Sequence, residues 1–237
     1  IFSNFFGLPR HIVFDNFAYV LQRPDYFIAL KNSAIITGVA IVAMVFFLPM
    51  CAYAISRRRF TSRFYSFLYF FMVAGIFIPF QVKMLPMVKL MSNIGLLNRT
   101  GAILFYIANS TCEGIFLLVG YLSSMPIDLE EAAYIDGAGF YRTFFVIVFP
   151  LAKSGLATGA ILQFLTSWNE FMFGLVLTKS TEVRTLPLAL NYFTSQFSFN
   201  YTAMFAALTM VILPSIVIYV LLQEQVTTSM VAGSVKG

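Results

Sequence analysis

Pro126–Pro150 read PIDLEEAAYIDGAGFYRTFFVIVFP, and this short polar segment governs how the rest of the chain is interpreted. It carries carboxylates and small residues, whereas long hydrophobic runs stand on either side of it. A polar segment between membrane spans suits docking with a soluble partner, because it can pass force to the spans that it joins. The alternative interpretation is a connector that lies at the membrane surface.

The segment predicts two short helices separated by a glycine turn. Pro126 stops the preceding helix, and Asp128 with Glu131 three residues later forms a variant of the capping box. Gly137 can adopt the left-handed conformation that ends a helix. An apolar helical pattern then resumes at Phe140. The spacing i, i+3, i+4, i+7 predicts one common face on the first helix, made of Leu129, Ala132, Ala133 and Asp136.

The composition indicates a membrane protein. The 237 residues are 59% hydrophobic and 11% charged, with a mean hydropathy of +0.84. A soluble domain is about 45–50% apolar and about 25% charged. So much apolar surface cannot be hidden in the chain's own core, so lipid must cover it. We therefore predict an all-α integral membrane protein, with residues 1–237 forming a single transmembrane domain.

Hydropathy predicts a polytopic helix bundle. A span needs about 20 mostly apolar residues. Five stretches qualify, at Ser33–Ile55, Phe64–Phe80, Gly101–Leu122, Gly155–Leu177 and Tyr201–Leu222. The polar connections include an expected interfacial helix and turn within 81–100, and a loop at 123–154 that contains the opening segment.

The orientation rests on one dense basic cluster, because Lys and Arg are almost equally numerous on the two sides. The cluster is interpreted as a cytoplasmic anchor that flanks the first predicted span. Alternation then puts 123–154 and the C-terminal tail on the cytoplasmic side as well. The cluster consists of Arg57, Arg58, Arg59 and Arg63.

No metal or catalytic centre is predicted. Cys51 and Cys112 lie in apolar sequence without metal-type neighbours, so they are expected to be two buried thiols. The single histidine, His11, lies outside the predicted spans, which argues against a membrane enzyme. Secondary carriers often have paired repeats and intramembrane charges that bind coupling ions. Glu113 and Glu170 are the only charges within the predicted spans, and no repeat is visible.

The loop closely resembles the EAA motif of binding-protein-dependent ABC importer permeases. The matching positions are Glu131, Ala132, Ala133, Asp136, Gly137, Ala138, Ile147 and Pro150, whereas Phe149 stands where the family commonly has Leu. Further segments resemble the carbohydrate-uptake branch, the MalG-type permeases: AYAISRRRF at 52–60, IPFQVKMLP at 78–86, WNEF at 168–171, TLPLAL at 185–190 and VAGSVKG at 231–237. The resemblance covers essentially the whole chain.

The resemblance implies the type I ABC importer permease fold in a bacterial cytoplasmic membrane. Five spans are visible of an expected six, so the first span is expected to precede Ile1. The implied partners are a second related permease, two cytosolic ATPase subunits and an extracytoplasmic sugar-binding protein. ATP and Mg are expected on the ATPases, because this chain has no GxxxxGK[ST] phosphate loop. Permeases for amino acids, metals or phosphate remain alternatives, and the sugar is not identified.

The resemblance also implies an ATPase-docking site on the loop. Gly137 would allow the tight turn, and a side chain with a Cβ should weaken docking there. The C-terminal tail resembles the family's tail that reaches between the ATPases. The predicted docking residues are Glu130, Glu131, Ala132, Ala133, Asp136, Gly137, Ala138, Phe140 and Lys236.

Polar residues within the spans are candidates for a substrate path, because such residues are costly in a membrane. Trp168 could stack on a sugar ring, and Asn169 and Glu170 could bond its hydroxyls. The alternatives are interhelical hydrogen bonding that holds the bundle together, or sugar contacts made mainly by the partner permease. The candidates are Asn109, Glu113, Gln163, Trp168, Asn169 and Glu170.

Overall fold

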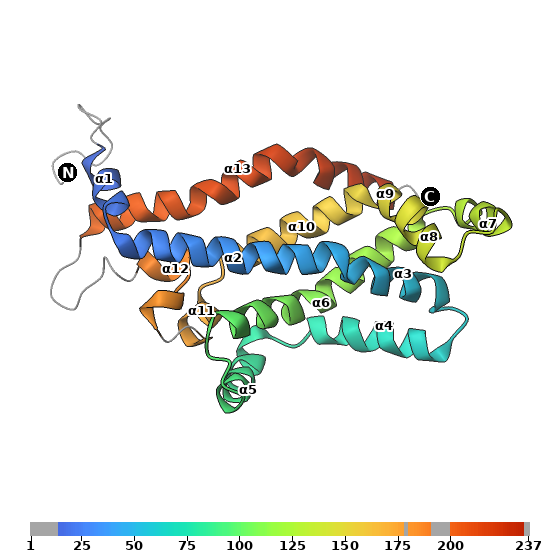
Figure 1. Cartoon of the computed structure of the whole chain (residues 1–237), viewed down its shortest axis with the longest axis horizontal. Coiled ribbons are helices and arrows are strands. Elements are labelled where there is room, and N and C mark those ends of the chain that lie inside the picture. The colour runs from blue at the N-terminus through green and yellow to red at the C-terminus, as the bar shows by residue number, and fades with distance from the viewer. Residues whose placement is uncertain (1–13, 178–179, 191–199, 235–237) are drawn as a thin grey trace.

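The computed structural model describes residues 14–177, 180–190 and 200–234, and every regular element within these ranges is helical (Figure 1). His11 and Lys236 lie outside the described residues. The elements are α1 (Asp15–Leu21), α2 (Pro24–Phe46), α3 (Leu48–Arg58), α4 (Arg63–Ile76), α5 (Phe80–Asn93), α6 (Arg99–Ser124), α7 (Asp128–Ile135), α8 (Phe140–Thr143), the π-helix η1 (Phe144–Val148), α9 (Phe149–Leu151), α10 (Lys153–Trp168), α11 (Met172–Leu177), the 3-10 helix η2 (Thr181–Val183), α12 (Leu186–Ala189) and α13 (Tyr201–Ser234). The predicted all-α architecture is confirmed.

Three helical stretches of the described residues are long and apolar enough to cross a membrane. They are Pro24–Arg58, Arg99–Ser124 and Tyr201–Glu224, of 35, 26 and 24 residues. Two further helix pairs meet the same criteria together but are sharply bent, α4 with α5 by 102° and α8–α9 with α10 by 73°. The five predicted spans thus correspond to three continuous helices and two bent pairs.

The second predicted span, Phe64–Phe80, is wrong as a single straight helix. Helix α4 ends at Ile76, and Pro79 precedes α5, which turns away by 102° and forms the helix predicted within 81–100. Pro79 has no amide hydrogen to donate to a helix, and its ψ of 144° is extended rather than helical (φ −58°). Fourteen residues in α4 are too few to cross a bilayer alone.

The fourth predicted span, Gly155–Leu177, is also wrong in its second half. Helix α10 ends at Trp168, and α11 starts again at Met172. The break is stabilised by Glu170, whose carboxylate accepts hydrogen bonds from the backbone amides of Phe173 and Gly174. A side chain that takes up these amides competes with a continuous helical ladder.

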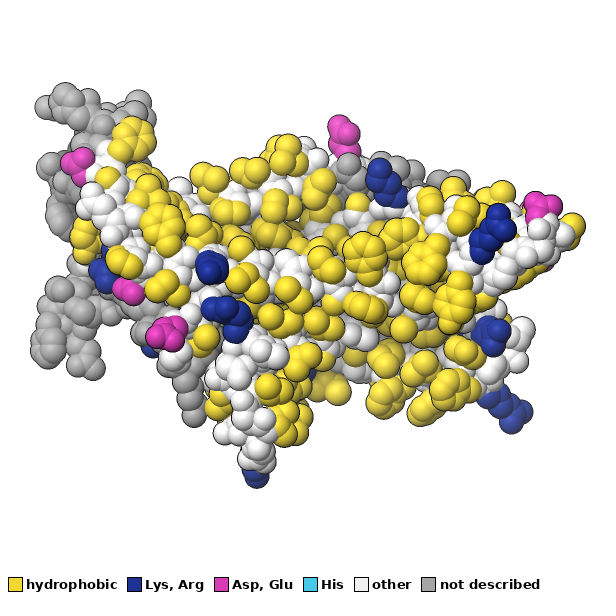
Figure 2. Space-filling view, in the orientation of Figure 1, with side chains coloured by type: hydrophobic (Ala, Val, Ile, Leu, Met, Phe, Trp, Pro, Cys, Tyr) yellow, Lys and Arg dark blue, Asp and Glu magenta, His cyan; other side chains and the backbone are white. Residues whose placement is uncertain are grey.

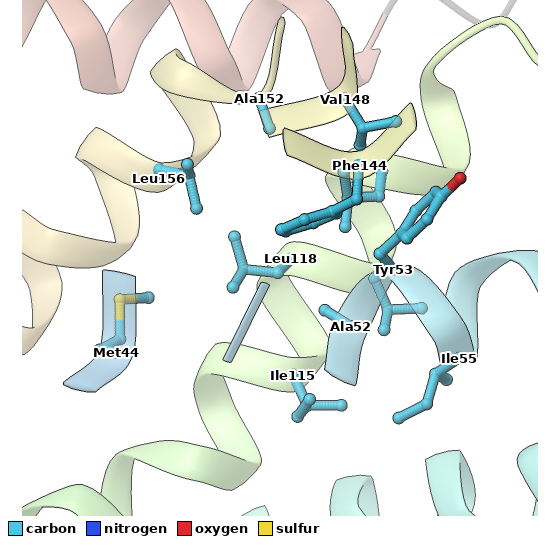
Figure 3. Packing of buried hydrophobic residues seen from close by; sticks show 12 residues of the cluster. Met44, Ala52, Tyr53, Ile55, Ile115, Leu118, Phe144, Val148, Ala152 and Leu156 are labelled. Carbon is cyan, nitrogen blue, oxygen red and sulfur yellow. The ribbon is translucent and has the colours of Figure 1, made fainter. Parts of the chain in front are cut away.

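The outer surface is largely apolar, as a protein in lipid requires. Figure 2 shows hydrophobic side chains over most of the visible face, with Lys, Arg, Asp and Glu mainly toward the two ends. Inside the bundle, one buried cluster joins α3, α6, η1 and α10 around Leu118 and Phe144 (Figure 3). The prediction of two buried thiols is wrong for Cys51, which is exposed on α3, whereas Cys112 is partly buried, and both are free. Cys51 therefore lies on the side of α3 that faces away from the bundle.

Small residues let α10 approach its neighbours closely. A Cβ at Gly155 would lie 2.7 Å from the ring of Tyr121, and one at Gly159 would lie 2.1 Å from the Cε of Met44. The Tyr121 hydroxyl is also hydrogen-bonded to Ser154 Oγ at 2.5 Å. Glycines spaced four residues apart are a common basis of tight helix packing in membranes. The contact between α10 and α6 therefore depends on Gly155.

We predict that Gly155→Ala lowers stability by about 1–3 kcal/mol, because the new methyl group overpacks against a ring that its own hydrogen bond holds in place. The measurement is the free energy of unfolding in mixed micelles. Gly120→Ala is the matched control on α6, since a Cβ there meets nothing within 4 Å. Equal stability of the two alanine variants would contradict this account of the α6–α10 contact.

Candidate functional site

Helix α7 projects beyond the end of the bundle, at the right of Figure 1. The turn between α3 and α4 and the C-terminal end of α13 lie at the same end, whereas α1, α11 and α12 lie at the opposite end (Figure 1). The geometry thus confirms that the arginine cluster, the 123–154 loop and the end of the last helix share one side.

The glycine turn after α7 has the predicted left-handed conformation. Gly137 has a φ of +78°. The amide of Ala138 donates to the Ala133 carbonyl at 2.9 Å, and the amide of Gly137 donates to the Tyr134 carbonyl at 3.1 Å. These two bonds form a Schellman motif, which satisfies carbonyls that the helix end would otherwise leave free.

The predicted capping box at the start of α7 is wrong. Asp128 is the first helical residue rather than the cap, Ile127 occupies the cap position, and no side chain caps the helix. Asp128, Glu130 and Glu131 all lie in the first turn. Their charges still favour the helix start, because a helix N-terminus carries partial positive charge.

Glu130 points into the bundle rather than outward. Its side chain is 5% exposed and forms an ion pair with Arg57, whose Nε donates to Oε1 at 2.9 Å. The hydroxyl of Tyr53 donates to Oε2 at 2.6 Å, and Arg57 Nη1 donates to the Leu122 carbonyl at 2.9 Å. One buried ionic network therefore joins α7 to α3 and to the end of α6.

The outward surface of α7 is exposed and partly apolar. Ile135 is 86% exposed, and Ile127, Leu129 and Tyr134 are each about half exposed. Of the predicted docking residues, the exposed ones are Glu131, Ala132, Asp136 and Gly137. Ala133 is buried, so it does not share one exposed face with Leu129, Ala132 and Asp136 as the spacing predicted, and Ala138 is half-buried. We call Ile127, Leu129, Glu131, Ala132, Tyr134, Ile135 and Asp136 the outer face of α7.

Phe140 packs against the bundle and begins a continuous path from the loop to α10. Its ring centroid lies 5.1 Å from that of Tyr53. The chain then passes through the π-helical turn η1 and through α9 before it bends into α10. Pro150 has no backbone N–H and so cannot donate the hydrogen bond that a regular helix would need there. This accounts for the irregular turn next to the bend.

A cleft between α5, α6 and the α10–α11 break holds two of the predicted substrate-path residues. Asn109, Thr166 and Glu170 line it together with the aromatic rings of Phe80 and Tyr106, and its volume is ≈ 200 Å³. Polar groups beside aromatic rings match the mixed polar and apolar surface of a sugar. We call this the outer cleft.

The polar side chains at the outer cleft are held by hydrogen bonds. Lys83 Nζ donates to Asn109 Oδ1 at 2.6 Å, and the hydroxyl of Tyr106 donates to Glu170 Oε2 at 2.7 Å. Lys83 and Tyr106 were not among the residues predicted from sequence to line a substrate path. The signal that could have found them is a charged or hydroxyl side chain in or beside an apolar run. Glu170 therefore both stabilises the helix break and lines the cleft.

A second, smaller cleft continues along the seam between α6 and α10. It has a volume of ≈ 40 Å³ and is lined by Ser110, Glu113, Gln163 and Thr166 among others. Gln163 is buried and donates to Ser167 Oγ at 2.6 Å. Because Thr166 lines both clefts, the two lie next to each other. We call the smaller one the inner cleft, and both together the polar seam.

Trp168 and Asn169 lie away from the polar seam. Trp168 is buried, donates from Nε1 to the Val211 carbonyl at 3.0 Å, and stacks on Phe164. Asn169 Nδ2 donates to Leu165 O at 2.9 Å and to Ser215 Oγ at 3.3 Å. The hypothesis that Trp168 stacks on a sugar is thus not supported by its position. Both residues instead join α10 to α13, as the interhelical alternative proposed.

The fold and the loop define a polytopic helical membrane protein with a loop that projects from one end of the bundle. The family model described as "Binding-protein-dependent transport system inner membrane component" matches residues 49–230. The chain belongs to this family, and the resemblance inferred from the EAA loop is confirmed.

Relatives match along nearly the whole chain. The multiple sugar-binding transport system permease protein MsmG of Streptococcus mutans is 35% identical over 240 residues, covering 100% of this chain and 86% of that protein. The probable starch degradation products transport system permease protein AmyC of Thermoanaerobacterium thermosulfurigenes is 32% identical over 236 residues, covering 100% of this chain and 85% of that protein.

Solved structures share the fold. A bacterial ABC transporter involved in the import of the acidic polysaccharide alginate matches with a TM-score of 0.81 and 26% identity, over 92% of this chain and 81% of that one. The methionine transporter MetNI in an inward-facing conformation matches with a TM-score of 0.64 at 16% identity, over 85% and 94% of the two chains. The latter similarity shows the fold alone.

We predict that Glu130→Ala destabilises the chain by about 2–4 kcal/mol, because it leaves the partly buried Arg57 without its counter-charge. Glu130→Met combined with Arg57→Met should recover most of this loss, since no buried charge then remains unpaired. Unfolding in mixed micelles measures both. Glu131→Ala is the matched control, and as an exposed neighbour it should change stability by less than about 0.5 kcal/mol. Similar losses for Glu130→Ala and Glu131→Ala would refute a structural role of the ion pair.

Proposed function

We propose that this chain is the permease subunit of an ATP-driven, binding-protein-dependent sugar importer in a bacterial cytoplasmic membrane. Membership of the family of inner membrane transport components supports the permease assignment. The names of the relatives MsmG and AmyC support sugars as the substrate class. The chain itself is a transport subunit, and ATP with Mg binds to its partner ATPases.

The proposed assembly contains a second, related permease, two cytosolic ATPases and an extracytoplasmic sugar-binding protein. A structural neighbour supports this composition, since it is an alginate ABC transporter in complex with a periplasmic protein that holds an alginate pentasaccharide. Residues 1–237 act as one transmembrane permease domain. The tail through Lys236 contributes to ATPase contact, as the family resemblance implies.

The observation that carries the coupling proposal is the combination of an exposed apolar outer face on α7 with a buried ionic tie on its inner face. An apolar surface such as Ile135, exposed on the cytosolic side, marks a protein–protein contact. The tie to Arg57 prevents α7 from moving independently of α3 and α6. A rigid element of this kind transmits force.

The mechanism follows from these connections. The ATPases grip the outer face of α7, and their closure upon ATP binding displaces it. The displacement passes through Glu130 and Arg57 to α3 and α6, and through the bend at Ala152 into α10. Because α6 and α10 flank the polar seam, their relative movement changes which side of the membrane the seam opens to.

An uptake assay in vesicles distinguishes the proposed function from two alternatives. A permease for another small solute is the first alternative, since MetNI shares the fold. An ion-coupled secondary carrier is the second. In vesicles, the proposed importer requires ATP, the ATPases and the binding protein, and it continues to transport after ion gradients collapse. Uptake of a sugar, rather than of an amino acid, selects between the two ABC assignments.

We predict that Ile135→Asp weakens ATPase binding by about thirtyfold, because a central apolar contact contributes about 2 kcal/mol to an interface. Retention of the ATPases during purification and ATP-dependent uptake should both fall. Phe60→Asp is the matched control, since Phe60 is 84% exposed on the α3–α4 turn at the same end. If Ile135→Asp retains the ATPases as well as Phe60→Asp does, α7 is not the docking element.

We predict that Gly137→Val impairs coupling whereas Gly139→Val does not. Gly137 has a φ of +78°, a conformation that costs a β-branched residue about 1–2 kcal/mol. Gly139 has a φ of −78° and space for a Cβ, so it tolerates the same substitution. The measurement is sugar-stimulated ATP hydrolysis by the reconstituted complex. Normal hydrolysis with Gly137→Val would show that the turn is dispensable for docking.

A further inference from the structure

Glu113 carries a carboxylate at the depth of the membrane interior. It lies 14 positions after Arg99 and 11 before Ser124 in the continuous helix α6. At 1.5 Å per residue, these are roughly 21 Å and roughly 16 Å along the helix axis. The hydrocarbon core of a bilayer is about 30 Å thick. Glu113 therefore cannot reach either membrane surface.

The carboxylate of Glu113 is exposed, and the described part of the chain offers it no hydrogen bond or ion pair. The side chain lines the inner cleft beside Ser110, Gln163 and Thr166. A charged group at this depth is too costly to face lipid and is expected to face a water-filled cavity. The polar neighbours identify the polar seam as that cavity.

No cationic side chain among the described residues lines either cleft of the seam. The second carboxylate, Glu170, lies in the outer cleft, where a hydroxyl and backbone amides bind it. Lys83 does not line either cleft but lies beside the outer one, where its ammonium group donates to Asn109. The charged side chains that line the two clefts are thus both carboxylates, Glu113 in the inner cleft and Glu170 in the outer one. A narrow passage between low-dielectric walls strengthens the effect of such a charge on a passing solute.

We propose that Glu113 sets the charge preference of the passage, so that the polar seam admits neutral and amine-bearing sugars and retards sugars that carry carboxylates. This inference rests on the proposed function for the statement that sugars pass. It differs from what is known of the alginate importer, whose substrate is an acidic polysaccharide. The two transporters would then share a fold and differ in the charge along the substrate path.

The test measures the electrostatic potential of the seam without any substrate. The two native cysteines are replaced (Cys51→Ala, Cys112→Ala), and Thr166→Cys introduces one thiol where the clefts meet. In the assembled complex, with and without trapped ATP, the thiol is modified by a cationic and by an anionic methanethiosulfonate reagent of similar size. The rate ratio is compared among the parent, Glu113→Gln, and the matched control Asp25→Asn at the exposed end of α2.

We expect the cationic reagent to react faster in at least one state, and the rate ratio to fall by about fivefold or more with Glu113→Gln, because a unit charge a few ångströms away has this effect in partly screened surroundings. Asp25→Asn should leave the ratio unchanged. The proposal is overturned if Glu113→Gln does not change the ratio, or if the thiol reacts in neither state, which would mean that a partner subunit covers Glu113. Failure of the proposed function would instead appear as absent ATP-dependent sugar uptake, which this assay does not use.

Discussion

The ion pair between Arg57 and Glu130 is the interaction on which the arrangement of the loop depends. A buried carboxylate is stable only with a counter-charge and further hydrogen bonds, and Arg57 and Tyr53 supply both. Arg57 also binds the Leu122 carbonyl at the end of α6. A single side chain thereby connects three segments, and the short helix α7 is attached to the bundle as one body with it.

This attachment gives the two faces of α7 different tasks. The inner face, with Glu130 and Ala133, packs against the bundle, so only the outer face is accessible to a partner. Figure 3 shows Tyr53 and Phe144 beside each other, with the Tyr53 hydroxyl at the edge of the apolar cluster. The same ring that packs in the core thus also contributes to the ionic network. Movement of α7 must therefore displace the core around it, including α10 and the polar seam.

Hydropathy predicted the helical architecture and the three continuous spans, because long apolar stretches have few other stable forms in lipid. It did not reveal the breaks at Pro79 and Glu170, since each depends on local backbone conformation or on a carboxylate bound to amides. The turn at Gly137 was predictable, because a glycine after a short helix has a specific conformational reason. The partner of Glu130 was not, because Arg57 is 73 residues away in the sequence and resembles a membrane anchor.

The residues of the candidate site also differ in how far the sequence could predict their positions. Asn109, Glu113, Gln163 and Glu170 were found as polar residues in apolar runs, and they line or adjoin one seam. Trp168 satisfied the same criterion, yet it faces α13, because a helix with several polar positions does not reveal from sequence which face meets which neighbour.

The central claim is that α7 moves as one body with the end of the bundle. The most direct measurement is the distance between spin labels at Phe60 on the α3–α4 turn and Asp128 on α7, recorded in the assembled complex with and without ATP. A single narrow distance distribution that ATP leaves unchanged would agree with a rigid attachment. A shift of that distance with ATP, or a second population, would show that α7 swings on its own and would contradict the account.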